Sequence, residues 1–531
     1  MRLHRLGLAC VSMCVVLTGC AEDGAGPLHD EQEQRTPVNP NDSVGDGTDA
    51  EGRDIAGTRT VFVMNTERFF TAVGVAVRGK DMSANPPEIL IRNGSTFTRI
   101  RGSPYAGGYR FLNVPEGAYY LKTSATTYVV TDEQHVEIGR NRLAREDTVF
   151  TEQYYNPLHL NLTNLAPWNA STPYPNGSRL QFTSGEVEFL GEANIFDTIP
   201  NGETRLDTQN ASLDSYLGGT PVFEAAKGDR LYVNQLTAVN QGYLPSGQSL
   251  TASTVVRSME VPAFDYVPDG MTPLYISGAM QNVPLSNVSL EWRLGSYAPL
   301  ASAVHPAATY RSAAFYIEAS AHGPEEGWVG YSGEVFAATL PQGAAFTLAQ
   351  NFSYGNPYPS HWRMIGTAYH TYTTAEVPSG VGGPPRTLRG NITVVDELEN
   401  LVVNPIIPTL TPPRGLAIDG IPATSQRVVG NSSPVISWQP PANGAPTAYR
   451  VTVQHLHPEF QILTTYGSIF LPSTTTEVRL PPGYLAPGSI YFLKVAAIDS
   501  PNADVAREPF SSYEKLPSVY ADTVSSLFST P

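Results

Sequence analysis

The chain is 531 residues long, which is too many for one hydrophobic core and predicts three or four domains. It carries 49 acidic and 33 basic residues, and the net charge of −16 argues against partners such as nucleic acid or an anionic lipid surface. All three cysteines lie at or before position 20, so no disulfide is expected in the rest of the chain.

The first segment has the features of an export signal. Met1–Arg5 is positively charged, and Leu6–Val16 is an apolar run shorter than the roughly 20 residues of a membrane-spanning helix. The run ends in LTGC, whose last residue is Cys20, and this sequence resembles the lipobox of bacterial lipoproteins. The resemblance implies that residues 1–19 are a removed signal peptide and that Cys20 carries acyl chains that anchor the protein to a membrane. A plain secretory signal that happens to end in cysteine is the alternative.

Residues 20–57 are expected to form a disordered acidic tether. Between Ala21 and Gly57 the chain has ten acidic residues, two arginines and hardly a bulky apolar side chain. Such a segment cannot bury enough surface to offset the entropy lost on ordering. Ala21 is not the aspartate that signals retention at the inner membrane in enteric lipoproteins, so we expect the outer membrane of a Gram-negative cell envelope.

The region 58–151 is predicted to be a β-sandwich. Short runs rich in β-branched and aromatic residues alternate with turns that contain Asn, Gly and Pro. Phe111, the turn Pro115-Glu116-Gly117 and Tyr119 resemble the hairpin of carboxypeptidase-regulatory-like and transthyretin-like sandwiches. The resemblance implies an accessory module without chemistry of its own.

The region 152–400 contains many further strand candidates and few windows with helical periodicity. This pattern predicts one large antiparallel sandwich or two stacked ones. A propeller is the alternative, although no motif recurs at the period of a blade. No known family is recognised in this region.

Aromatic residues are concentrated between Asn351 and Thr374. As a strand, this stretch would place Trp362 and Tyr372 on one face. The first interpretation is a β core. The second is an exposed platform, formed by Tyr358, Trp362 and Tyr372, on which sugar rings or a partner surface would stack.

The region 411–531 resembles a fibronectin type III domain. The resemblance rests on Trp438 followed by two prolines, on the strand sequence YRVTV, and on LAPGSIY ending at Tyr491. It implies that the tryptophan is buried between two sheets and that the tyrosine hydroxyl ties a strand corner to the backbone. The region exceeds the usual length of about 100 residues. The surplus lies in Ser500–Ser518, a loop for which a binding role is a second interpretation.

The sequence offers no recognisable catalytic, cofactor-binding or metal-binding motif. Ser332 lacks the second glycine of a nucleophile elbow. The adjacent Glu325 and Glu326 would face opposite ways in a strand, whereas a glycosidase needs two carboxylates about 5–9 Å apart. We therefore expect no catalytic residue, no cofactor and no metal.

Three functional hypotheses follow from the predicted all-β architecture, in which several β-sandwich domains follow a signal and a tether. The first is a membrane-anchored envelope lipoprotein with a structural, adhesion or binding role, and with polysaccharide or envelope proteins as partners. The second is a glycan-active hydrolase or lyase with accessory modules. The third is a subunit of an envelope assembly or secretion complex.

Overall fold

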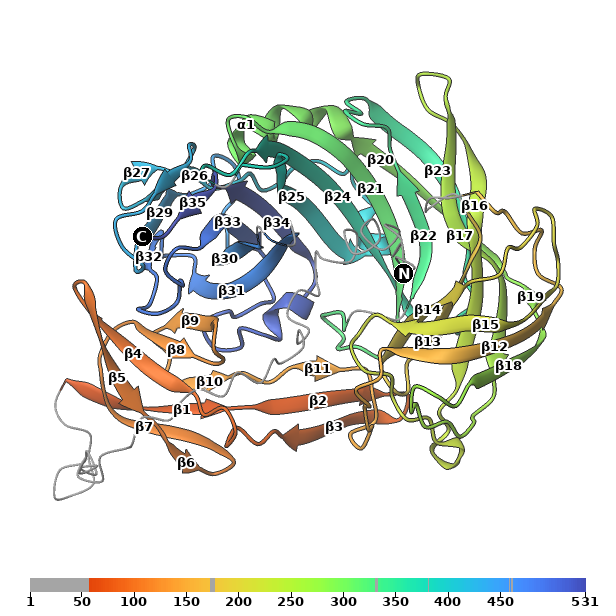
Figure 1. The fold of residues 1–531 in the computed structure, drawn as a ribbon, viewed down its shortest axis with the longest axis horizontal. Coiled ribbons are helices and arrows are strands. Elements are labelled where there is room, and N and C mark those ends of the chain that lie inside the picture. Colours follow the sequence, from red (N-terminus) through yellow and green to blue (C-terminus); the bar gives the residue numbers. More distant parts are fainter. Residues whose placement is uncertain (1–56, 172–176, 330–332, 381, 458, 460–461) are drawn as a thin grey trace, which may run out of the picture.

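The computed structural model describes residues 57–171, 177–329, 333–380, 382–457, 459 and 462–531. The described residues are mostly strand, with two short α-helices, α1 (Ala301–Val304) and α2 (Leu398–Leu401) (Figure 1). The prediction of an all-β protein built from sandwiches is therefore confirmed. Within the described ranges, no helix has the length and apolar character needed to cross a membrane. Cys20 and the predicted tether up to residue 56 lie outside the described residues.

The N-terminal part, residues 57–151, contains two sheets packed face to face and a third that extends from them. One sheet has the order β10-β1-β7-β6, the facing strands are paired in the order β5-β4-β8-β9, and the third sheet has the order β11-β2-β3. The strands are β1 (Thr58–Met64), β2 (Thr66–Thr71), β3 (Gly74–Gly79), β4 (Glu88–Asn93), β5 (Thr96–Arg101), β6 (Ser103–Tyr105), β7 (Gly108–Pro115), β8 (Tyr119–Lys122), β9 (Thr127–Thr131), β10 (His135–Glu137) and β11 (Asn141–Arg142).

The predicted hairpin of the N-terminal part lies in β7 and β8. Phe111 and Tyr119 are both fully buried between the two sheets, and the Tyr119 hydroxyl donates to the carbonyl of Glu133 at 2.8 Å. Gly117 in the intervening turn has a φ of 102°, which L side chains rarely adopt. The local chemistry expected of this hairpin is present, while the resemblance to a particular family stays a prediction.

The middle part, residues 152–400, is built on one long curved sheet. Its strands pair in the order β18-β12-β15-β14-β13-β16-β17-β22-β21-β24-β25. The strands are β12 (Tyr155–Thr163), β13 (Arg179–Ser184), β14 (Phe189–Ile195), β15 (Leu206–Ser215), β16 (Leu231–Tyr243), β17 (Ser249–Val261), β18 (Leu274–Ala279), β19 (Gln281–Asn282), β20 (Leu285–Arg293), β21 (Thr309–Ser320), β22 (Glu334–Thr339), β23 (Thr347–Gly355), β24 (Arg363–Glu376) and β25 (Arg386–Glu397).

Two separate clusters of buried side chains fill the middle part. One lies within the curve formed by β12 to β18, and it includes Leu160, Phe182 and Val233. The other lies between the large sheet and the two-stranded antiparallel sheet β20–β23, and it includes Trp292, Phe315 and other aromatic residues. A single sheet thus covers two cores.

The C-terminal part, residues 411–531, is a sandwich of two sheets in a fibronectin type III-like arrangement. One sheet has the order β27-β26-β29-β32, and the other β31-β30-β33-β34. The strands are β26 (Arg414–Ile418), β27 (Ile421–Pro422), β28 (Arg427–Val428), β29 (Val435–Gln439), β30 (Ala448–His457), β31 (Ile462–Pro472), β32 (Glu477–Arg479), β33 (Ile490–Asp499), β34 (Ser518–Val524) and β35 (Phe528–Ser529).

The residues expected to frame the C-terminal sandwich occupy the expected places. Trp438 is buried, and its ring contacts Tyr449 with centroids 5.3 Å apart. The Tyr491 hydroxyl accepts a hydrogen bond from the backbone N–H of Ala486 at 3.0 Å, which ties the corner before β33 to that strand. These contacts make Trp438 and Tyr491 framework residues.

Strand pairing continues from one part of the chain into the next. β34 of the C-terminal part pairs antiparallel with β25 of the middle part, with Ala521 opposite Ile392. β31 pairs in parallel with β9 of the N-terminal part, with Ser468 opposite Thr127. The three parts therefore share one sheet, and in Figure 1 the N-terminal part runs beneath both of the others. The predicted domain boundaries stay predictions. Strand pairing crosses between the parts that these boundaries delimit, so the parts are not separate modules.

The long loop Ser500–Ser518 reinforces this junction. The carbonyl of Arg507 accepts from the N–H of Glu137 at 2.8 Å in the N-terminal part. The N–H of Leu516 donates to the carbonyl of Glu326 at 3.0 Å in the middle part. The surplus residues of the C-terminal sandwich thus hold all three parts together.

Candidate functional site

The aromatic stretch lies in the protein core. Tyr358, Trp362 and Tyr372 are all buried, and Trp362 is only 5% exposed. The rings of Tyr358 and Trp362 stack with centroids 4.6 Å apart, and Tyr232 packs on the edge of Trp362 at 5.6 Å. The hypothesis of an exposed ligand platform at these three residues is corrected by their burial, because a buried ring presents no face to a sugar.

His370, in the same stretch, belongs to a buried hydrogen-bonded network. The indole N–H of Trp292 donates to His370 Nε2 at 3.2 Å, so Nδ1 carries the proton and faces the Tyr310 hydroxyl at 2.9 Å. Burial holds the pKa of His370 well below its usual range. The ring of Tyr297 stacks on the neutral imidazole. This histidine is therefore structural.

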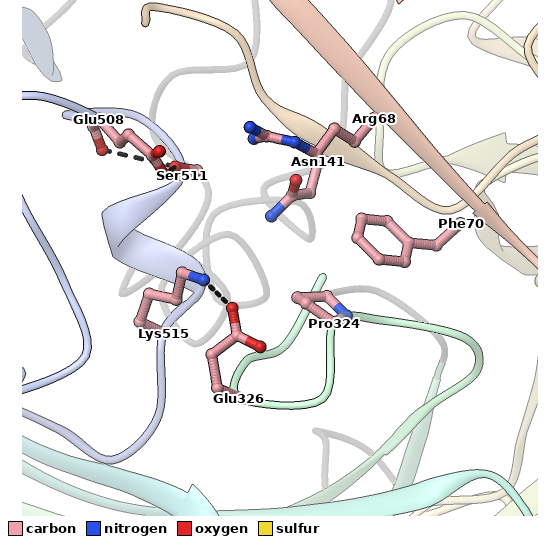
Figure 2. Close-up of a pocket in the computed structure, with 8 residues that line it drawn as sticks. All are labelled: Arg68, Phe70, Asn141, Pro324, Glu326, Glu508, Ser511 and Lys515. Atoms are coloured by element: carbon pink, nitrogen blue, oxygen red, sulfur yellow. Dashed lines mark hydrogen bonds and ion pairs between the residues drawn. The ribbon is translucent and has the colours of Figure 1, made fainter. Parts of the chain in front are cut away.

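A small pocket of about 300 Å³ lies where the three parts of the chain meet (Figure 2). The N-terminal part contributes one wall, the turn that includes the adjacent Glu325 and Glu326 contributes a second, and the loop Ser500–Ser518 contributes a third. The residues that line it are Arg68, Phe70, Asn141, Pro324, Glu326, Glu508, Ser511 and Lys515.

Strand register brings the side chains of the first wall together. Asn141 of β11 lies directly opposite Arg68 of β2, so the two side chains share a face of the three-stranded sheet. Phe70, two residues after Arg68 on the same strand, extends that face. Arg68, Phe70 and Asn141 therefore form a continuous wall of the pocket.

Two pairs of side chains that line the pocket already interact with each other. Lys515 forms an ion pair with Glu326, and the Ser511 hydroxyl donates to Glu508 at 3.2 Å. The ammonium of Lys515 holds the pKa of Glu326 below its usual range, mainly through their hydrogen bond. These contacts fix the wall formed by the loop and the turn.

The side chains of Arg68 and Asn141 have fewer interactions within the pocket. Figure 2 shows no hydrogen bond or ion pair from Arg68 to any other side chain that lines the pocket. Asn141 is 5% exposed, and its Oδ1 has no hydrogen-bond partner among the residues that the structure describes. A cationic donor and a buried acceptor therefore stand side by side at the same cavity.

A buried carboxyl lies behind this wall. Burial raises the pKa of Glu514 to about 8, and a hydrogen bond from the Asn141 side chain only partly opposes that rise. Near neutral pH the Glu514 carboxyl is therefore largely protonated, so it does not cancel the positive charge of Arg68.

A second group of acidic side chains lies in the middle part. Arg179 of β13 forms ion pairs with Glu192 of β14, at 3.6 Å, and with Glu334 of β22. Glu318 of β21 lies opposite Glu334 in the sheet, and burial together with the Glu334 charge raises the pKa of Glu318 to about 8. Because Arg179 engages two of these carboxylates, the group links β13 and β14 to β22.

The other candidate residues from the sequence divide into two groups. Cys20 and Ser332 lie outside the described residues. The carbonyl of Glu325 accepts from Arg363 at 2.8 Å, while the Glu326 side chain reaches the pocket.

Sequence reasoning missed the first wall of the pocket. No motif marked Arg68 or Asn141, because a lone arginine and a lone asparagine in strands have no distinctive spacing. The unusually long loop Ser500–Ser518, for which a binding role was the second interpretation, was the signal that pointed toward this region.

No family model and no curated protein matches the chain. Among solved structures, the FN1–FN3 domains of chicken CNTN1 are 9% identical, with a TM-score of 0.13, and the match covers 68% of this chain and 99% of that one. A streptococcal ancillary pilin is also 9% identical, with a TM-score of 0.11, and the match covers 62% of this chain and 95% of that one. TM-scores this low add nothing to the fold, so the fibronectin type III-like architecture of residues 411–531 rests on its own strand order and on the framework of Trp438 and Tyr491.

Proposed function

We propose that this chain is an envelope lipoprotein with a structural or adhesion role, held to the outer membrane through a lipid on Cys20. The observation that carries the proposal is the sheet that passes through all three parts by way of β25–β34 and β31–β9. Shared strands and a shared core resist relative motion of the parts, which suits a protein that presents surfaces at a fixed distance from a membrane.

The chemistry of the described residues favours binding over catalysis. His370 is neutral and fully bonded in the core, and Glu192 and Glu334 are both paired with Arg179. A glycan-active enzyme would instead need two carboxylates that face a substrate across a cleft. The enzymatic hypothesis therefore ranks below the binding one.

One observation favours the assembly hypothesis as a second candidate. The β2–β3 hairpin carries Val73, Val75 and Val77, which are 97%, 52% and 62% exposed. Among the described strands, β3 pairs only with β2, so its other edge offers free backbone groups. Exposed apolar edge strands are sites where another chain can add a strand.

The lipid anchor can be tested at one residue. In a bacterial host with lipoprotein-processing enzymes, Cys20→Ser is expected to abolish labelling by radioactive palmitate and to leave an uncleaved precursor, because the thiol that receives the lipid is gone. Cys14→Ser is the matched control, since this cysteine lies inside the predicted signal. Normal palmitate labelling and membrane retention of the Cys20→Ser chain would contradict the anchor.

A further inference from the structure

We propose that the pocket at the junction of the three parts binds a sugar acid, that is, one pyranose ring that carries a carboxylate and several hydroxyls. The proposal deepens the binding role proposed above by naming a ligand class. It does not require the lipid on Cys20, so the two ideas can fail separately.

The size of the pocket limits the ligand. Sites for small molecules usually span about 300–1,000 Å³, and this one, at about 300 Å³, lies at the lower limit. A single sugar ring fits such a volume, whereas a nucleotide or a folded peptide segment does not. The ligand is therefore a free monosaccharide or the terminal unit of a glycan.

Arg68 selects a carboxylate. A guanidinium offers two parallel N–H donors that match the two oxygens of a carboxylate. Arg68 is half-buried and forms no hydrogen bond or ion pair with the other lining side chains (Figure 2). A ligand carboxylate would supply the anion that this guanidinium lacks within the pocket.

The remaining polar atoms of the lining favour a ligand that carries hydroxyl donors over a ligand that carries a second negative charge. The carboxylates of Glu326 and Glu508 and the hydroxyl of Ser511 line the cavity and accept hydrogen bonds. Phosphate or sulfate would bring negative charge toward these acceptors and donate little to them. A sugar acid carries one negative charge and several O–H donors, so it satisfies both halves of the lining.

The apolar atoms of the pocket suit the face of a sugar ring. Phe70 and Pro324 lie on one side of the cavity in Figure 2, across from the Glu508–Ser511 pair. The C–H bonds of a pyranose can pack on such a surface while its hydroxyls reach the polar walls. Phe70 and Pro324 supply the apolar part of a lining that is otherwise polar.

Binding would also stabilise the junction between the three parts, because each part contributes residues that line the pocket. A ligand that binds only the assembled pocket stabilises the assembled state in proportion to the logarithm of its concentration over its dissociation constant. Thermal stability therefore gives a readout of binding that is independent of calorimetry.

The test uses the purified full chain and three probes. Glucuronate carries the carboxylate, glucose has the same ring without it, and inorganic phosphate carries charge without the ring. Isothermal titration calorimetry is expected to detect glucuronate with an affinity at least about tenfold higher than that for glucose or phosphate, and glucuronate alone is expected to raise the melting temperature. In a second titration a glucuronate oligosaccharide is compared with glucuronate: tighter binding of the oligosaccharide indicates the end of a glycan, and tighter binding of the monosaccharide indicates a free sugar acid.

Variants identify the site. Arg68→Met is expected to weaken glucuronate binding by about 10- to 100-fold, because a charge-assisted pair of hydrogen bonds is lost. Arg68→Lys keeps the charge without the fork and should fall between Arg68→Met and the unmodified protein. Arg101→Met, at an exposed position at the end of β5, is the matched control and should bind normally.

Three outcomes would overturn the assignment. The first is glucuronate binding no tighter than that of glucose or phosphate. The second is an Arg68→Met variant that binds glucuronate as the unmodified protein does while melting at the same temperature. The third is loss of binding in Arg101→Met as well as in Arg68→Met, which would place the ligand elsewhere. If palmitate labelling at Cys20 fails while glucuronate binds at Arg68, only the proposed anchor is wrong.

Discussion

At the level of single residues, neighbours decide what an aromatic side chain does. Trp362 could have been a platform for sugar rings, yet it lies among Tyr232, Tyr358 and the rest of the large buried cluster. Tyr372 donates from its hydroxyl to the carbonyl of Tyr297 at 2.9 Å, which satisfies its polar atom inside the core. Such a hydrogen bond offsets the cost of removing the polar atom of an aromatic side chain from water.

Truncation of Trp362 should reveal its role in the core. Trp362→Ala is expected to lower the free energy of unfolding by about 3–5 kcal/mol, because it leaves a cavity among packed rings. Tyr275→Ala, at a residue that is 69% exposed, is the matched control and should change stability by less than about 0.5 kcal/mol. Urea denaturation of both variants measures the difference. An unchanged unfolding midpoint for Trp362→Ala would contradict its place in the core.

Glu318 should make stability depend on pH. Its pKa is raised from the ordinary value of 4.5 to about 8, so the folded protein holds a proton that the unfolded chain releases. Stability from this group is therefore fully present below about pH 4.5 and is lost as the pH rises through about 8. The expected loss of unfolding free energy is about 1–3 kcal/mol, once solvent screening at this half-buried site is allowed for. Glu318→Gln should not show this loss, because its side chain does not titrate.

The measurement for Glu318 is a series of denaturation curves between about pH 5 and about pH 8. Other buried carboxyls, such as Glu192 and Glu514, also have raised pKa values, so the informative quantity is the difference between Glu318→Gln and the unmodified chain. Glu399→Gln, at an exposed position in α2, is the control. Parallel pH profiles for Glu318→Gln and the unmodified protein would refute the assignment.

At the level of elements, edge strands determine how the parts are joined. In an isolated fibronectin type III-like sandwich, β31 and β34 would be the two edges of one sheet. Here β9 covers the first edge and β25 covers the second, so neither is free to pair with another molecule. The loop Ser500–Ser518 adds hydrogen bonds to both neighbouring parts.

A fragment from Pro412 to Pro531 tests this view. It should unfold cooperatively, because the framework of Trp438 and Tyr491 is complete within it. It should also self-associate, because removal of the other parts uncovers two strand edges together with Ala496, which packs against the N-terminal part. Thermal unfolding and analytical ultracentrifugation give the two readouts. A fragment without a cooperative transition would contradict the boundary near 411, and a strictly monomeric one would contradict the role of the edges.

Across the whole molecule, one sheet replaces a row of independent modules. The largest buried cluster contains residues from the N-terminal part, such as Tyr128, from the middle part, such as Phe315, and from the C-terminal part, such as Tyr491. Shared sheet and shared core give one body whose junctions are themselves packed. The candidate pocket exists only because these three parts meet, so it belongs to the assembled molecule rather than to any one of them.

The class of fold and the local frameworks could be predicted from the amino-acid sequence. Alternation of apolar residues over short runs, separated by Gly, Pro and Asn turns, was sufficient to predict strands throughout. The turn at Gly117 could be predicted because its chemistry lies within a few consecutive residues, and the corner at Tyr491 was implied by the resemblance to fibronectin type III domains. Such local signals do not depend on where the rest of the chain goes.

The joining of the parts and the place of the pocket depend on tertiary contacts that no local pattern encodes. The pairings of β9 with β31 and of β25 with β34 use backbone N–H and C=O groups. Every strand offers these groups, so no residue type in the sequence predicts which strands will pair. The pattern within residues 351–374 favoured a core but also allowed a platform, and the contact of Tyr232 with Trp362 decides for the core. Arg68, Asn141 and Lys515 form one pocket because three distant segments converge, and convergence in space leaves no spacing in the sequence.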